Sequence, residues 1–218
     1  IYFGVRGAAP SASDGGTNPT SPAQTFNTNN MLSLSLANDT GASMTDNITS
    51  NGQVNVSGVS ASSWRYSLDN ETSWTNGSGT SFTVTGDGSK SAMVQKWDST
   101  NSVWSASTAP LEFTLDTAAP VFSSGTASGH TISLSFSEAI NGNTPPAASD
   151  FQVLLDGTGS SVSSLSINGS TIVVTLADDV GNASIHLTYS RTLPNAAVSD
   201  VAGNENTSFS MDLYAVQY

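Results

Sequence analysis

The stretch SSLSINGSTIVVTLA, residues 163–177, decides the fold class of this chain. On both sides of Asn168 and Gly169, apolar residues alternate with polar ones, which is the period of a half-buried β-strand. Asn-Gly between two alternating runs is the strongest local signal for a β-hairpin, because both turn residues then take positive φ. We therefore predict two antiparallel strands joined at this dipeptide.

Comparable alternating runs recur along the rest of the chain. They read HTISLSFSEA, DFQVLLDG, IHLTYS and FSMDLYAVQY around the hairpin, and MLSLSLA, QVNVSG, WRYSLD, SFTVTG, SAMVQKW and LEFTLD before it. Short strands at this spacing, with no helix-period stretch, are typical of β-sandwiches. Because 218 residues are about twice the commonest domain size, we predict an all-β fold of two tandem immunoglobulin-like β-sandwiches, residues 25–117 and 118–218, after an extended N-terminal arm and linker, residues 1–24.

Composition restricts the partners. The chain has 5 basic and 17 acidic residues and a formal net charge of −12, so nucleic acid and anionic membranes are repelled while cations are attracted. No apolar run is long enough to span a bilayer, which argues against membrane insertion, and any signal peptide has been removed or lies outside this chain. Few Lys and many Ser and Thr residues are typical of secreted repeat proteins, so we expect a secreted, cell-surface location.

The stretch LDTAAPVF, residues 115–122, is the predicted joint between the two domains. Pro120 fixes its own φ and pushes the residue before it toward an extended conformation, so the joint is short and stiff. Counting strands places acidic loop residues of both domains at this joint. They are Asp39, Asp46, Asp69, Asp87 and Asp116 from the first domain, and Glu138 and Asp200 from the second. Converging carboxylates repel unless a cation neutralises them, and Ca²⁺ accepts such irregular oxygen ligands. We expect Asp39, Asp46, Asp87, Asp116, Glu138 and Asp200 as its ligands; alternatively, each carboxylate only bonds its own turn.

The N-terminal arm begins with IYFGV, in which Ile1, Phe3 and Val5 alternate with Tyr2 and Gly4. A five-residue apolar strand on a Gly-, Pro- and Ser-rich linker forms no core of its own. It is disordered, or pairs with its own domain, or adds to a sheet edge of another copy of the chain. The last alternative predicts a filament built head to tail by strand donation; if the chain is a fragment, the arm is the remainder of a preceding domain.

The sequence gives little support for an enzyme, so we expect a non-enzymatic protein. The two histidines, His130 and His186, fit solvent-facing strand positions, and the chain has no cysteine. Trp64 is the expected core aromatic of the first domain. Trp74 and Trp104 are the candidates for an exposed aromatic platform, which a carbohydrate-binding module requires.

Several stretches also carry a family resemblance. Residues 31–120, with LSLANDTGASMTDNITSNGQVNVSG, WRYSLDNETSWTNGSGTSFTV and LDTAAP, resemble the bacterial immunoglobulin-like repeats of giant secreted adhesins. Residues 120–209, with LSFSEAI, PAASDFQV, SINGSTIVVTLADDV and VSDVAGNENTSF, resemble a long surface-protein repeat first recognised in a cyanobacterial swimming-motility protein. These resemblances imply an extracellular spacing or adhesive role, with calcium stiffening the joints.

The leading hypothesis is therefore a calcium-stiffened extender segment of a cell-surface adhesin. The alternatives are a strand-donating filament subunit and a carbohydrate-binding module. The expected partners are other copies of the chain or adjacent repeats of a longer chain, together with surface glycans or proteins.

Overall fold

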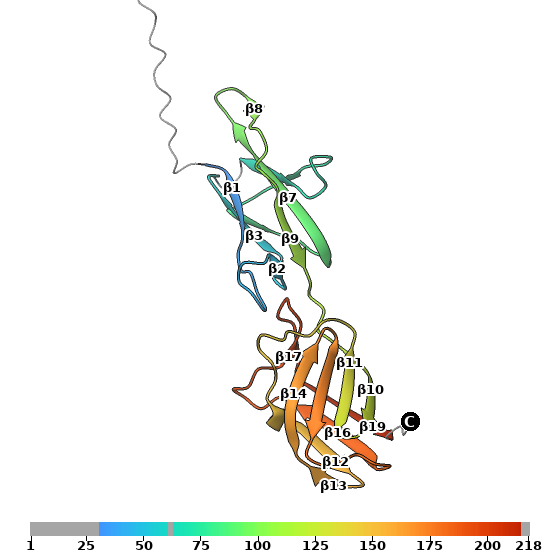
Figure 1. Ribbon diagram of the computed structural model, residues 1–218. Coiled ribbons are helices and arrows are strands. Elements are labelled where there is room, and N and C mark those ends of the chain that lie inside the picture. Colours follow the sequence, from blue (N-terminus) through green and yellow to red (C-terminus); the bar gives the residue numbers. More distant parts are fainter. Residues whose placement is uncertain (1–30, 61–62, 215–218) are drawn as a thin grey trace, which may run out of the picture.

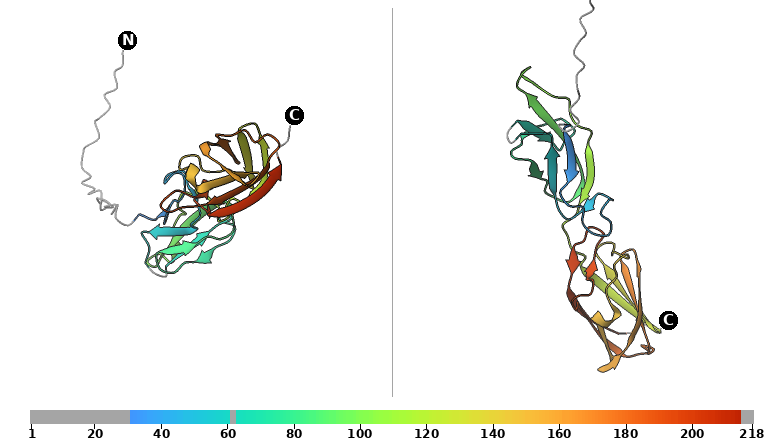
Figure 2. Two further views of the ribbon diagram at one scale, coloured as in Figure 1. Left: turned by 90° about the horizontal axis from the view of Figure 1, so that it is seen from below. Right: turned by 90° about the vertical axis from the view of Figure 1, so that its left-hand side faces the viewer.

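The computed structural model describes residues 31–60 and 63–214 as an all-β protein. Two groups of β-sheets stand end to end, and the same elongated arrangement is visible in the turned views (Figures 1 and 2). The described residues contain one short 3₁₀ helix, Ala148–Asp150, and no helix that is long and apolar enough to cross a bilayer. The predicted arm and linker, with Ile1, Phe3 and Val5, lie outside the described residues.

Two packed sheets make up the first domain. Its strands are β1 (Ser33–Leu36), β2 (Ile48–Thr49), β3 (Gln53–Ser57), β4 (Trp64–Ser67), β5 (Thr75–Asn76), β6 (Ser81–Thr83), β7 (Gly88–Asp98), β8 (Val103–Trp104) and β9 (Leu111–Leu115). One sheet has the order β1-β3-β6 and the other β2-β9-β7-β4-β5, with β8 paired to β7. Alternation explains the packing, because in β3 Val54 and Val56 are buried while the residues between and beside them are exposed.

Trp64 lies at the centre of the first core and is 1% exposed, as predicted. Its ring packs near Tyr66 and Phe82, and its indole Nε1 donates to the carbonyl oxygen of Gly79 at 3.0 Å. Gly77 lies directly on the ring, and a Cβ atom there would come within 2.3 Å of it. The glycine therefore makes room for the largest side chain of this core.

The second domain is a sandwich of two four-stranded sheets. Its strands are β10 (Phe122–Ser128), β11 (Thr131–Phe136), β12 (Phe151–Leu155), β13 (Thr158–Ser160), β14 (Val162–Asn168), β15 (Thr171–Leu176), β16 (Ser184–Ser190), β17 (Val198–Ser199), β18 (Glu205–Asn206) and β19 (Ser208–Tyr214). The sheet orders are β10-β11-β15-β14 and β13-β12-β16-β19, and β17 pairs with β18. The inward residues of β11, β15 and β16 form a core that is separate from that of the first domain.

The hairpin at residues 163–177 is present, but its turn differs in detail from the prediction. Asn168 pairs with Thr171 as the last residue of β14, so the two turn residues are Gly169 and Ser170. Only Gly169 has positive φ, at 56°, which is the pattern of a type II′ turn. Asp156 and Gly157, between β12 and β13, both have positive φ and form the type I′ turn of this domain instead.

Candidate cation site at the joint between the two domains

The link between the domains is short. The last strand of the first domain, β9, ends at Leu115, and β10 begins at Phe122. Asp116 is the first residue after β9, and its backbone N–H still donates to the carbonyl oxygen of Thr49 at 3.0 Å. This bond holds the aspartate at the joint end of the first domain.

Two loops of the second domain bring further carboxylates to the same place. Glu138 follows β11, and Asp200 follows β17 and forms an isolated bridge with Ile140. One carboxylate oxygen from each of Asp116, Glu138 and Asp200 lies within 4.8 Å of the other two. Asp200 is fully buried, whereas the other two acids are half-buried. Three acidic side chains from both sides of the joint therefore converge on one point.

Asn204 fixes the geometry of this cluster. Its backbone N–H donates to Asp200 Oδ1 at 2.9 Å, and its Nδ2 donates to Asp200 Oδ2 at 2.8 Å. The same Nδ2 also donates to the backbone carbonyl oxygen of Asp116 at 2.8 Å. The amide thus orients the buried carboxylate and ties it to the link between the domains.

The electrostatics of the cluster is unfavourable without a neutralising charge. Burial, followed by the negative charges of Asp116 and Asp200, raises the pKa of Glu138 above its usual value. Asp87 adds a smaller contribution in the same direction. The two ion pairs among the described residues, His186–Asp212 and Arg191–Glu205, include none of these acids. A proton or a bound cation is therefore what relieves the repulsion.

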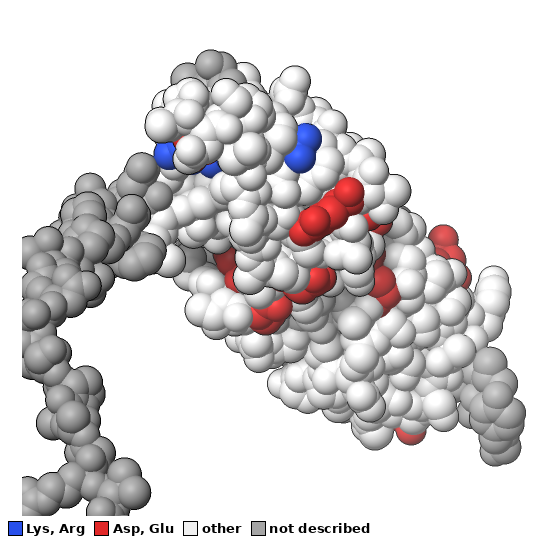
Figure 3. Space-filling model, turned by 90° about the horizontal axis from the view of Figure 1, so that it is seen from above, with Lys and Arg blue, Asp and Glu red and all other residues white. Residues whose placement is uncertain are grey.

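The donor set fits a hard divalent cation. The three carboxylates offer oxygen ligands only, and Ca²⁺ takes six to eight oxygens with irregular geometry, whereas Mg²⁺ requires a near-ideal octahedron. Each carboxylate oxygen that accepts one hydrogen bond keeps a lone pair for a metal ion. Seen from above, Asp and Glu side chains gather in the middle of the visible surface, apart from the Lys and Arg side chains (Figure 3).

The other predicted ligands lie outside the group of three. Asp87 borders the site, where its Oδ1 accepts from the N–H and hydroxyl of Thr117 at 3.0 and 2.8 Å. In the loop before β2, Asp39 Oδ2 accepts from the N–H of Asn47 at 3.0 Å, and Asp46 Oδ1 accepts from the N–H of Ile48 at 3.1 Å. Each of these two carboxylates accepts a hydrogen bond within its own loop, while the other carboxylate oxygen of Asp39, Oδ1, is buried without a partner among the described residues.

Asp69 also bonds its own loop. The hydroxyl and backbone N–H of Ser73, and then the hydroxyl of Ser67, lower its pKa to about 2. These hydrogen bonds favour the charged form of the exposed carboxylate without any metal ion. Asp69 is therefore a loop-stabilising residue in this structure.

The two domains also contact each other directly, which the sequence does not predict. Thr40 Oγ1 donates to the carbonyl oxygen of Ala202 at 2.6 Å, and the N–H of Ala42 donates to the carbonyl oxygen of Val201 at 2.9 Å. Between them, Gly41 has φ +91°, and a Cβ atom there would lie 2.1 Å from the Val201 oxygen. Gly203 faces it from the second domain with φ +90°. The only sequence signal for this close approach is the pair of loop glycines.

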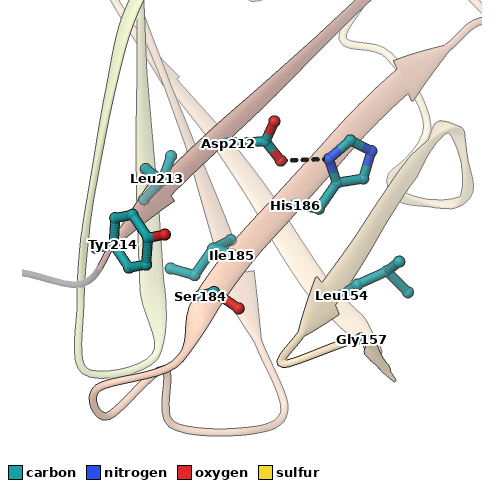
Figure 4. Close-up of a pocket in the computed structure, with 8 residues that line it drawn as sticks. All are labelled: Leu154, Gly157, Ser184, Ile185, His186, Asp212, Leu213 and Tyr214. Carbon is teal, nitrogen blue, oxygen red and sulfur yellow. Dashed lines mark hydrogen bonds and ion pairs between the residues drawn. The ribbon is translucent and has the colours of Figure 1, made fainter.

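A hollow lies on the outer face of the sheet formed by β12, β16 and β19 (Figure 4), in the part of the second domain that points away from the joint (Figure 1). It has a volume of about 310 Å³, and His186 Nδ1 pairs there with Asp212 Oδ1 at 2.6 Å. Thr188 Oγ1 lies 3.2 Å from His186 Nε2, whereas the Ser184 hydroxyl donates to Asp156. The His186 and Asp212 side chains are 47% and 83% exposed, so water screens this pair. Its geometry is that of a surface cross-strand pair, in line with the solvent-facing position expected for His186.

Comparison with known proteins gives a match for part of the chain. Residues 115–194 match the model of a family described as a flagellar system-associated repeat. The family's link to the flagellar system is itself a proposal. The match begins at the last residue of β9 and covers the link and most of the second domain, which is somewhat more than a third of the chain. No immunoglobulin-like adhesin family was found to match, so the resemblance of residues 31–120 has no such support.

No curated protein and no solved structure matches the chain significantly. The family match agrees with the surface-protein repeat that residues 120–209 resemble, although it ends before the last strands. Residues 115–194 are thus similar to a repeat family of bacterial surface proteins.

Proposed function

We propose that this chain is a non-enzymatic, extracellular spacer segment of a cell-surface adhesin, in which a Ca²⁺ ion at the joint stiffens two successive domains. The observation that carries the proposal is the convergence of Asp116, Glu138 and Asp200 within 4.8 Å at the point where the domains meet. The end-to-end arrangement of the two sandwiches supports a spacer role (Figure 1). The similarity of residues 115–194 to a surface-protein repeat supports a place within a longer chain of repeats.

The proposed ion would bind ligands on both sides of the joint. Asp116 belongs to the link, and its N–H is bonded to Thr49 of the first domain. Glu138 and Asp200 belong to loops of the second domain. An ion that coordinates all three therefore resists bending between the domains and stabilises the loops that carry its ligands.

Calorimetric titration with Ca²⁺ alone tests this proposal. We expect one site per chain with a dissociation constant in the range of extracellular modules, about 10⁻⁴ to 10⁻³ M. Asp200→Asn keeps the size of the side chain and removes one charged ligand, so it should abolish the heat of binding. Asp179→Asn, which changes an exposed acid that caps only Gly181, is the matched control and should bind like the unaltered chain. Absence of saturable Ca²⁺ binding, or equal binding by both variants, would contradict the proposal.

A second candidate function, assembly into a filament by strand donation, is favoured by one open sheet edge. On one side β9 pairs with β7 along its whole length, but on the other side β2 pairs only with Thr114 and Leu115. Within the described residues, the remaining edge of β9 has no strand partner. Beside it lies a groove of about 270 Å³, lined by Leu32, Ser33, Leu34, Thr108, Ala109, Pro110 and Leu111. An apolar arm such as IYFGV suits this groove, because alternate side chains enter it while the backbone pairs with the edge.

Removal of residues 1–12 tests the filament candidate. The shortened chain should remain monomeric and should bind a synthetic peptide of residues 1–12, whereas the same peptide with Phe3→Asp should not bind. If the full chain is also monomeric at high concentration and the peptide does not bind, strand donation is excluded.

A further inference from the structure

Three of the four tryptophans lie together on the outer face of one sheet of the first domain, away from the joint. Trp97 of β7 and Trp104 of β8 form a cross-strand pair with ring centroids 5.2 Å apart and nearly perpendicular planes. Trp74 lies just before β5, and the Arg65 guanidinium packs against both the Trp74 ring and the Trp104 ring. All three side chains are half-buried, unlike Trp64 in the core. We call Arg65, Trp74, Trp97 and Trp104 the tryptophan face.

Arg65 is clamped at the centre of this face. Its guanidinium carbon lies 4.6 Å from the centroid of the Trp74 ring and 4.3 Å from that of the Trp104 ring. Its Nε and Nη2 atoms donate to Gln95 Oε1 at 2.9 and 2.6 Å. Two ring faces and one amide therefore fix the guanidinium group in a single orientation.

The positive charge of Arg65 has no carboxylate partner among the described residues. Its Nη1 atom has no protein acceptor there, and it is not among the buried polar atoms that lack one. Within residues 31–60 and 63–214, the Arg65 guanidinium is thus held by two ring faces and an amide without a carboxylate partner, in a chain of net charge −12 that has only 5 basic residues. Fixed N–H donors of this kind match the geometry of a carboxylate ligand.

The same part of the domain has a hollow of about 540 Å³, and Trp104, whose ring packs against Arg65, is one of the residues that line it. It is lined by Ser63, Trp64, Asn76, Gly77, Trp97 and Trp104. Asn76 is the cross-strand partner of Arg65, and its exposed amide offers both donors and an acceptor. The volume lies within the range of small-molecule sites, and the lining joins aromatic rings to a few polar groups.

This combination matches the two-sided chemistry of a sugar ring. The C–H groups on one face of a pyranose carry slight positive charge and stack on the negative face of an indole ring. The hydroxyl groups at the rim bond to amide and hydroxyl side chains. A cationic ligand is disfavoured because Arg65 already occupies the space between two tryptophans.

We propose that the tryptophan face and its hollow bind an acidic saccharide, whose ring stacks on Trp97 and Trp104 and whose carboxylate pairs with Arg65. This goes beyond the spacer role, and it does not depend on a cation at the joint. The preferred ligand is a uronic-acid oligosaccharide of the kind that surrounds cells and covers surfaces. In this account the part of the first domain that lies away from the joint binds the saccharide, while the joint determines how stiffly the two domains are connected.

Tryptophan fluorescence and calorimetry test the proposal on the full chain. The probes are a galacturonic acid trisaccharide and a neutral galactose trisaccharide of the same length. We expect saturable binding of the acidic sugar with a change in emission, because Trp97 and Trp104 line the hollow in which the sugar ring would stack. The affinity for the acidic sugar should exceed that for the neutral one by about tenfold, which corresponds to one charge-assisted hydrogen bond.

Two variants locate the site. Trp97→Ala removes the stacking ring and should abolish binding, but it also changes packing around β8. Asn76→Asp is therefore the decisive variant: it keeps the side-chain size at an exposed position and places a negative charge opposite Arg65. It should abolish binding of the acidic sugar without lowering the melting temperature, because an opposite-charge cross-strand pair does not destabilise the sheet. Tyr214→Ala, which removes a 77% exposed aromatic from the second domain, should bind normally.

The outcomes that overturn the proposal are equally definite. They are absence of binding for both sugars at millimolar concentration, equal affinity for the two sugars, and unchanged binding of the acidic sugar by Asn76→Asp.

Discussion

Replacement of Glu138 by Gln should stabilise the metal-free protein at neutral pH and remove its response to Ca²⁺. The variant keeps the volume of the side chain and deletes one of the three charges at the joint, so two of the three pairwise repulsions disappear. At 4.8 Å, two unit charges repel by about 1 kcal/mol in bulk water and by about 3.5 kcal/mol at the effective dielectric of a protein surface.

Because Glu138 and Asp116 are only half-buried, we take the lower part of this range. The two deleted repulsions then amount to about 2 kcal/mol, which raises the melting temperature of a domain of this size by roughly 10 °C. The pH dependence has a definite sign. The raised pKa of Glu138 means that the folded state gains stability when the acid is protonated, and that this gain is lost as the pH rises through the raised pKa.

The assay is thermal unfolding in chelator and in excess Ca²⁺, at neutral pH and near pH 5. In chelator, the unaltered protein should become more stable on acidification relative to the Gln variant. In Ca²⁺ at one hundred times the dissociation constant, the unaltered protein should gain about 2.7 kcal/mol and the variant far less. Glu71→Gln, which removes one negative charge at an exposed position in the loop after β4, is the matched control. It should neither raise the stability in chelator nor reduce the stabilisation by Ca²⁺. A Gln variant that is less stable than the unaltered protein in chelator would refute the repulsion argument.

Three further predictions concern single contacts. Gly41→Ala should loosen the joint without unfolding either domain, because its Cβ would lie 2.1 Å from the Val201 oxygen; limited proteolysis at the joint should accelerate, and an unchanged rate would contradict this. Asp150→Ala should destabilise the second domain by about 1 to 3 kcal/mol in urea unfolding, because Asp150 accepts from the N–H of Thr192 and the amide of Asn195; no change in the unfolding midpoint would exclude that role. Asp69→Asn should lower the melting temperature at neutral pH, because the lowered pKa of Asp69 stabilises the fold only while the carboxylate is charged. The difference in melting temperature between the variant and the unaltered protein should vanish as the pH falls from about 4 through about 2. A pH-independent difference would contradict this.

The fold could be predicted because strand alternation is a local property. In β11 and β15 every second residue is buried and the others are half-buried, as the sequence pattern requires. The predicted turn at Asn168 and Gly169 is wrong by one residue, because Asn-Gly signals a hairpin without fixing which residues lie in the loop. The Asp156–Gly157 hairpin carries an equally strong signal, although in the sequence Asp-Gly stands at the end of the alternating run DFQVLLDG.

The joint could be predicted in part. Strand counting indicated that Asp116, Glu138 and Asp200 face one another, because alternating connections place loops at defined ends of a sandwich. Counting places a loop but not the direction of its side chains, so it does not show that the Asp39 and Asp46 carboxylates accept hydrogen bonds from Asn47 and Ile48. The contact between Gly41 and Gly203 depends on how the two domains are docked, for which no periodic sequence pattern exists.

The tryptophan face illustrates the same limit. The sequence indicates Trp74 and Trp104 as candidates for an aromatic platform, but it does not indicate that Arg65 and Trp97 join them. The cross-strand register that brings Arg65 beside Asn76 and Gln95 follows from the pairing of three strands. Such a pairing between separate segments leaves no mark within any one of them.

The measurement that tests the central claim most directly is the distance distribution between one spin label in each domain, with and without Ca²⁺. The chain contains no cysteine, so Ser99→Cys and Ser128→Cys, both at exposed positions far from the joint along their strands, give two unique labelling sites. Our account predicts a broad distribution in chelator that narrows on addition of Ca²⁺, and no narrowing in the Asp200→Asn variant. Identical distributions in chelator and Ca²⁺ would contradict a cation-stiffened joint.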